Sequence, residues 1–306
     1  MTAINAKKRK SQKHDIVFPI CNGIFLCILM FVTLYPVLNT VAVSLNDGVD
    51  AVRGGIGIWP RQFSVEAYRT LLSDTQTYKA FGISVARTVI TTALNLVITS
   101  MLAFALSRKE YIFRGVITLV MVLTMYVNAG LIPNYLLISK TLNLSKSFWV
   151  YIIPTMFSCF NMIILRTYIM GLPEALAESA RIDGANDMRI FWQIIFPLCT
   201  PVLATVALFV AVGSWNQWFD THLYNAGKKD LHTLQYLLKM KLATSVNQAN
   251  AANASLDALA SMGSSKSTPI TIRCATTVVS ALPIMIVYPF LQRYFVTGMV
   301  LGGVKG

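Results

Sequence analysis

The stretch LPEALAESARIDGANDMRIFWQIIFP, residues 172–197, carries the strongest structural signal in the chain. Pro173 suits the first position of a helix, and Glu174 suits the positive end of the helix dipole. Gly184 can adopt the left-handed conformation that ends a helix, and the polar pair 186–187, Asn-Asp, can cap another. The stretch therefore predicts two helices joined by a tight turn, which we call the elbow.

The two helices of the elbow differ in the faces they present. Small or apolar side chains share one face of the first helix: Ala175, Leu176, Ser179 and Ala180. Glu178 and Arg181 are three residues apart, so we expect them to pair on the exposed face. The second helix carries an apolar stripe, which Pro197 ends or kinks at the membrane. A projecting elbow with small surface residues can fit closely into a groove of another protein.

The composition indicates a membrane protein. Hydrophobic residues make up 55% of the chain and charged residues 13%, against an average of about 25% charged residues in soluble proteins. A membrane helix needs about 20 largely uncharged residues. Six charge-poor segments meet this requirement and predict an all-α polytopic fold with spans at about 16–45, 87–107, 115–138, 147–169, 198–219 and 274–294. Prolines at 36, 133, 154, 197, 201, 283 and 289 predict kinks within several spans.

Charge near the N-terminus sets the expected orientation. Residues 1–15 hold five Lys or Arg residues and are followed at once by an apolar run, which favours a cytoplasmic tail over nucleic-acid binding. With six spans, both termini and the elbow are then cytoplasmic. Residues 221–271 form an external loop whose second half is rich in Ala, Asn and Ser, and a short external helix is expected near Ser64–Leu72.

Spacing within the elbow carries a family resemblance. Glu178-Ser179-Ala180 is followed by Gly184 and then by Ile194-Ile195-Phe196-Pro197. This resembles the Glu-Ala-Ala (EAA) loop of bacterial ABC importer permeases, with Ser179 in place of an alanine and Phe196 in place of a leucine. The resemblance covers about the last two-thirds of the chain. The C-terminal stretch from residue 283 is similar to the carbohydrate-uptake branch, nearest the permeases for oligosaccharides and polysaccharide fragments.

The resemblance implies a type I ABC importer transmembrane fold in the bacterial inner membrane. Its partners would be a dimeric ATPase subunit, an extracytoplasmic solute-binding protein that the external loop reaches, and a second permease, usually a different EAA-containing chain, with a homodimer left open. The C-terminal Lys305-Gly306 would approach the ATPase. The residues implied in coupling to the ATPase are Glu174, Glu178, Ser179, Ala180, Arg181, Asp183, Gly184, Ala185 and Pro197.

Polar side chains within the predicted spans are candidates for the substrate path, because they are costly to expose to lipid. They are Asn95, Tyr126, Asn128, Asn161, Trp215, Asn216 and Trp218. Sugars bind by aromatic stacking and amide hydrogen bonds, which these residue types supply. The alternative is hydrogen bonding between helices for the asparagines and anchoring at the membrane interface for the tryptophans.

Other classes of protein fit the sequence poorly. Residues 227–229, Gly-Lys-Lys, lack the glycine spacing and the Ser or Thr of a phosphate-binding loop, so ATP and Mg²⁺ are expected on the partner ATPase, with no cofactor or metal on this chain. A secondary transporter would need intramembrane carboxylates or an internal repeat, and the predicted spans lack Asp and Glu. An enzyme would need a nucleophile–base pair or a cluster of metal ligands, and the sequence indicates neither. An ABC permease for a non-sugar solute remains the main alternative.

Overall fold

The computed structural model describes residues 2–127, 129–252 and 267–303. Within these ranges the regular structure is helical apart from one isolated bridge between Asn46 and Phe63, so the predicted all-α class is confirmed. The described residues divide into two compact units, 2–73 with 241–279 and 74–240 with 280–303. The predicted path residue Asn128, the C-terminal pair 305–306 and most of the polar segment 245–267 lie outside the described residues.

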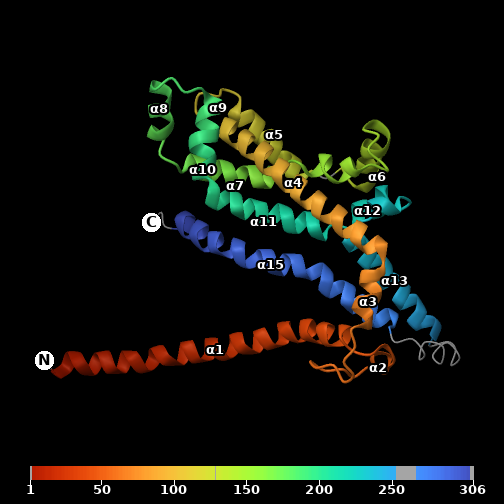
Figure 1. Cartoon of the computed structure of the whole chain (residues 1–306). Helices are drawn as coiled ribbons and strands as arrows, with labels where there is room; N and C mark the ends of the chain where they lie inside the picture. Colours follow the sequence, from red (N-terminus) through yellow and green to blue (C-terminus); the bar gives the residue numbers. More distant parts are fainter. Residues whose placement is uncertain (1, 128, 253–266, 304–306) are drawn as a thin grey trace. The chain divides into compact units, whose positions relative to one another are not determined.

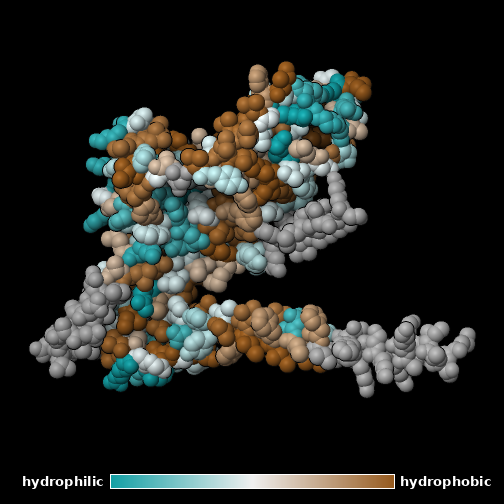
Figure 2. Space-filling view, turned by 180° about the vertical axis from the view of Figure 1, so that it is seen from behind, coloured by the Kyte–Doolittle hydropathy of each residue, from teal (hydrophilic) through white to brown (hydrophobic). Residues whose placement is uncertain are grey.

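The first unit contains α1 (Thr2–Ser44), α2 (Gly48–Val52), α3 (Glu66–Ser73) and the beginning of α15 (Pro269–Gly303). Residues 18–44 of α1 are long and apolar enough to cross a membrane, and almost all their large side chains are exposed. Figure 2 shows apolar side chains along this helix. So large an apolar surface is unfavourable in water, so we expect α1 to lie against lipid or against another apolar protein surface.

The segment between α1 and α3 is held by buried polar contacts. Asp50 is 7% exposed and accepts hydrogen bonds from Asn46 Nδ2 at 2.8 Å and Arg61 Nε at 3.0 Å. The short helix predicted near residues 64–72 is present as α3, and the Ser64 hydroxyl accepts a hydrogen bond from the Glu66 backbone N at 3.3 Å. This loop is therefore an ordered cap on the end of α1.

The second unit is built around α4 (Thr75–Ser107), which packs against α7 (Cys159–Met170) and α11 (Thr200–Asn216) (Figure 1). Fully buried apolar side chains at this junction include Ala103, Met162, Leu165, Ile190 and Val206. The helix α4 begins at Thr75, well before the predicted start at 87, and Arg87 lies inside it. The core thus sits toward the elbow end of α4.

Among the described residues, three helical regions are unbroken and apolar enough to span, within α1, α4 and α15, and three further candidates are broken pairs. The first pair joins α5 (Arg114–Tyr126) to α6 (Leu131–Leu136) and η1 (Leu137–Thr141). The second joins η2 (Phe148–Tyr151) and η3 (Ile153–Thr155) to α7 with a 46° bend. The third joins Asp187–Leu198 to α11 with an 80° bend. Pro154 and Pro201 lie beside the last two breaks. Proline favours a break because it cannot donate the helical hydrogen bond.

Shorter elements follow α11 in the second unit: α12 (Phe219–Tyr224), η5 (Lys229–Leu231) and the first turns of α13 (Leu234–Ala252). The backbone N of Leu234 donates to the Ser84 hydroxyl of α4 at 2.9 Å. Tyr151 of η2 donates its hydroxyl hydrogen bond to the Leu231 backbone oxygen at 2.6 Å. The segment after α11 is therefore fastened to both α4 and η2.

Candidate functional site

The elbow consists of α8 (Ala175–Ile182), a turn at Gly184, α9 (Asp187–Ile190), the π-turn η4 (Phe191–Ile195) and α10 (Phe196–Leu198). Gly184 has φ +80°, the left-handed conformation predicted for it. The Asn186 side chain caps α9 by accepting a hydrogen bond from the Arg189 backbone N at 2.9 Å. Pro173 lies two positions before Ala175, the first residue of α8, and Glu174 is the cap residue, so the prediction of Pro173 at the first helical position is wrong by two residues. The predicted turn and caps therefore set the shape of the elbow.

One face of the elbow is buried and the other projects apolar side chains outward. Ala177 is 3% exposed and belongs to the core formed by α4, α7 and α11. Ile182 is 87% exposed, Met188 52% and Leu176 41%. Exposed apolar side chains that gather on one surface are typical of surfaces that contact another protein.

Two ion pairs clamp the elbow to the loop that follows α4. Lys109 Nζ lies 2.6 Å from Glu174 Oε2 before α8, and Arg181 in the last turn of α8 donates two hydrogen bonds to Glu110. Arg181 also contacts Asp187 Oδ1 at 3.2 Å. The expected partner of Arg181 was Glu178, and that prediction is wrong because the carboxylates of the neighbouring loop and of α9 take its place.

We call the ion pairs Lys109–Glu174 and Arg181–Glu110 the clamp. Their contacts shift the pKa values of the residues in it. The hydrogen bond from Arg181 lowers the pKa of the Glu110 carboxyl, and the hydrogen bond to Glu174 raises the pKa of Lys109. Both groups therefore stay ionised at neutral pH. The pairs are exposed to solvent, so each is individually weak, but together they hold both ends of α8. A cavity of about 440 Å³ lies beneath them, lined by Arg108, Glu110 and Arg181 among others.

A second cavity of about 440 Å³ lies between α4, η3, α7 and α11. It is lined by Arg87, Thr91, Asn95, Pro154, Thr155, Phe157, Ser158, Asn161, Phe209, Val210, Gly213, Ser214 and Gln217. We call it the polar cavity. Two of the predicted path residues, Asn95 and Asn161, line it. Asn95 also donates to the Thr155 backbone oxygen at 3.1 Å, so it bridges two elements as the alternative interpretation expected.

The other predicted path residues lie elsewhere. Trp215 is 5% exposed and donates from Nε1 to the Ser280 backbone oxygen of α15 at 2.9 Å. Asn216 accepts from Gln235, and the Lys239 ammonium lies 4.9 Å from the centre of the Trp218 ring. Tyr126 is 82% exposed at the end of α5. Trp215 therefore packs helices together.

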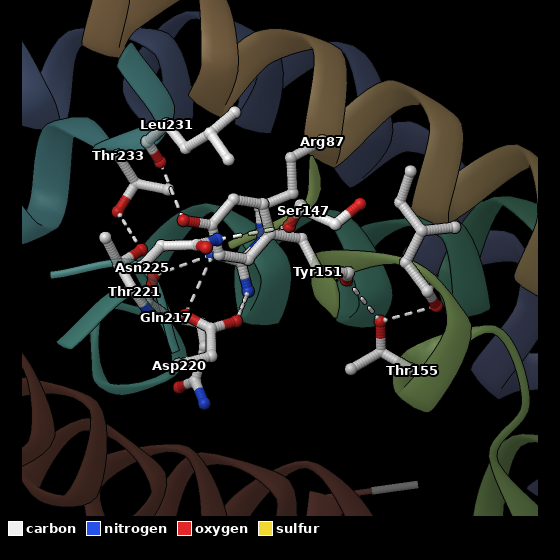
Figure 3. A network of polar contacts seen from close by, with 11 residues as sticks. Arg87, Ser147, Tyr151, Thr155, Gln217, Asp220, Thr221, Asn225, Leu231 and Thr233 are labelled. Carbon is white, nitrogen blue, oxygen red and sulfur yellow. Dashed lines mark hydrogen bonds and ion pairs between the residues drawn. The ribbon is translucent and has the colours of Figure 1, made fainter. Parts of the chain in front are cut away.

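An ion pair that the sequence did not reveal borders the polar cavity (Figure 3). Arg87 Nη1 and Nη2 lie 3.3 and 2.5 Å from the two carboxylate oxygens of Asp220, and Nη1 also donates to the Gln217 backbone oxygen at 3.0 Å. Their side chains are 2% and 13% exposed. The Arg87 guanidinium lies 4.9 Å from the centre of the Tyr151 ring. In the sequence both charges lie at the limits of charge-poor segments, and no local signal links them.

The described residues contain no group of three or more His, Cys, Asp or Glu side chains placed to hold a metal ion. The second unit therefore combines a polar cavity with an elbow whose outer face exposes apolar side chains.

Comparison with known proteins identifies the class. Residues 95–301 match the family described as "Binding-protein-dependent transport system inner membrane component". The chain is 36% identical over 285 residues to the polygalacturonan/rhamnogalacturonan transport system permease protein YtcP of Bacillus subtilis, covering 92% of this chain and 96% of that protein. It is 35% identical to Protein LplC of the same organism, covering 97% of each.

A solved structure shares the fold over nearly the whole chain. It is a chain of a bacterial ABC transporter involved in the import of the acidic polysaccharide alginate. That chain is 28% identical with a TM-score of 0.81, and the match covers 92% of this chain and 98% of that one. The resemblance drawn from the elbow is thus confirmed: the chain belongs to the family of binding-protein-dependent transport system inner membrane components, the permeases of ABC importers.

Proposed function

We propose that this chain is the permease subunit through which an oligosaccharide, delivered by an extracytoplasmic binding protein, crosses the inner membrane. Relatives named for polygalacturonan, rhamnogalacturonan and arabinooligosaccharide transport support the carbohydrate class. The amide and hydroxyl groups that line the polar cavity supply the hydrogen bonds that a sugar needs.

In this proposal both termini and the elbow face the cytoplasm. A separate ATPase dimer binds ATP and Mg²⁺ and receives the elbow, with Glu174, Glu178, Ser179, Ala180, Arg181, Asp183, Gly184, Ala185 and Pro197 at or behind the contact. A second permease subunit completes the path, and the external loop 221–271 meets the binding protein. The exposed apolar surface of α1 gives the second permease an area to cover.

The observation that carries the proposal is the elbow itself. It holds a fixed turn at Gly184, buries Ala177 against the core and exposes Ile182 almost completely. A side chain as apolar as isoleucine gains most when a partner surface covers it. An ATPase subunit that binds Ile182 would move α8 during its conformational change. The clamp would transmit this movement to the end of α4.

The test uses the importer reconstituted with its ATPase, second permease and binding protein. Ile182→Asp is expected to abolish ATP-driven oligosaccharide uptake, because it places a charge in the apolar contact. Phe63→Asp is the matched control, since Phe63 is 71% exposed on the segment between α1 and α3, and it should leave the ATPase-coupled step unchanged. Full uptake by Ile182→Asp would contradict the proposed docking.

A further inference from the structure

The polar cavity contains hydrogen-bonding groups that the protein itself does not satisfy. Thr91 is 1% exposed and lines the cavity from α4, and Ser214 lines it from α11. Both hydroxyl oxygens are buried and have no hydrogen-bond partner among the described residues. Buried polar groups are rarely left unpaired. Both oxygens are covered in this structure, so a ligand hydroxyl in the cavity could pair with each once the side chain rotates to expose its oxygen.

Arg87 is the one ionisable side chain among the described residues that line this cavity. Its charge is already matched, because both Nη atoms contact the Asp220 carboxylate and Nη1 also donates to Gln217. Of the three guanidinium nitrogens of Arg87, only Nε has no hydrogen-bond partner among the described residues. Recognition of a carboxylate by arginine uses two parallel donors, and in this site Asp220 occupies them.

A ligand carboxylate would therefore meet an unfavourable environment. It would leave water without gaining a free cation, and it would lie near the negative charge of Asp220. An uncharged hydroxyl or amide meets neither cost. The balance between Arg87 and Asp220 sets the charge preference of the cavity, because removing either residue leaves the other's charge without its partner.

We infer that the polar cavity selects the uncharged, hydroxyl-rich form of a saccharide over its carboxylate form, and that Asp220 determines this selectivity by neutralising Arg87. The inference rests on the proposed function, because it assumes that a saccharide passes through this chain. It goes further by naming the charge class of the group that the cavity holds. Asp220 acts through Arg87, so it is a positioning residue and need not touch the sugar.

The test measures equilibrium binding to the purified, fully assembled importer in nanodiscs, without the binding protein. The two probes are trigalacturonate and its fully methyl-esterified form, in which each carboxylate is replaced by an uncharged methyl ester. Wild type should bind the ester about tenfold tighter or more. Asp220→Asn frees the Arg87 cation and should shift the ratio toward the acid by about tenfold. The ratio within one variant cancels losses in the amount of folded protein.

Matched variants complete the design. Arg87→Gln should shift the ratio further toward the ester, and the double variant should return it near wild type, so the test survives if Asp220→Asn fails to assemble. Asp230→Asn is the control, since Asp230 is an exposed carboxylate paired with Lys79, and its ratio should not change.

A wild-type preference for the acid, or equal binding of the two probes, would overturn the inference. So would an unchanged ratio in Asp220→Asn and Arg87→Gln. Binding of neither probe by wild type would also overturn it, while ATP-driven uptake of an oligosaccharide by the same complex would leave the proposed function standing. Failure of the intact assembly to import any oligosaccharide tested would count against the proposed function itself.

Discussion

Gly184 allows the most direct test of the elbow. A side chain placed at this position would meet open space, but the backbone conformation is unfavourable for any other residue. Its φ is +80°, and a Cβ placed there would meet no atom within 4 Å. A substitution therefore changes the backbone energy without a steric clash. For an ordinary L-residue the left-handed conformation costs roughly 1–2 kcal/mol. That penalty lowers the population of the correctly shaped elbow about 5- to 30-fold.

The series Gly184→Asn, Gly184→Ala and Gly184→Val ranks the expected losses. Asparagine adopts the left-handed region more readily than other residues, and β-branched valine adopts it least. ATP-driven uptake by the reconstituted importer should therefore fall in the order Asn, Ala, Val, with Ala down by about 5- to 30-fold. Gly82→Ala is the control and should keep full activity, because Gly82 is exposed in the first third of α4 and a Cβ there would meet no atom within 4 Å.

The order of the three variants is the decisive result. If asparagine were as damaging as valine, the need at this position would be for absence of a side chain, as in close contact with a partner, and the conformational argument would fail. If alanine matched wild type in both uptake and ATP hydrolysis, the turn would not need to hold its shape.

Three further outcomes are expected. Reversing the charge of one clamp residue, Glu110→Arg, should reduce the uptake per ATP hydrolysed. Adding Arg181→Glu should restore part of that uptake. Absence of rescue would mean that the two residues do not act as a pair. Lowering the pH from 7 to below the pKa of Asp50 should open the segment between α1 and α3 to proteolysis. Hydrogen bonds lower this pKa, so the stabilisation is present above the ordinary pKa and is lost as pH falls through the lowered one. Asp50→Asn should remove this pH dependence, and an unchanged profile would refute the role. Trp215→Ala should destabilise the assembled protein by about 3–5 kcal/mol in thermal unfolding in detergent, whereas a shift of under about 1 kcal/mol would show that the ring is not part of the packed core.

The elbow could be predicted from the sequence because its signals are local. Gly184 and the cap at Asn186 lie within a few residues of the turn they form, and each has a conformational preference of its own. The partner of Arg181 could not be predicted in the same way. Glu178 lies on the same helix, but Glu110 arrives from a loop 71 positions earlier in the chain.

The buried ion pair was missed for a related reason. Arg87 and Asp220 are 133 positions apart, and a search for uncharged segments treats every charge as the end of a span. A charge inside a membrane helix can persist when a distant partner neutralises it. The prolines show the same limit: Pro36 and Pro283 lie inside unbroken helices, while Pro154 and Pro201 lie at bends, and only the surrounding packing decides between these outcomes.

The elbow and the polar cavity are joined by one straight element of secondary structure. The helix α4 is unbroken from Thr75 to Ser107 and contains no proline, whereas the neighbouring broken pairs include bends of 46° and 80°. Arg87 and Asn95 lie on it beside the cavity, and Lys109 and Glu110 follow its last turn at the clamp. From Arg87 to Ser107 the helix rises about 30 Å, roughly the thickness of the hydrocarbon core of a bilayer. Because a continuous helix bends little over that length, a displacement imposed on α8 must either break the clamp or move the cavity wall.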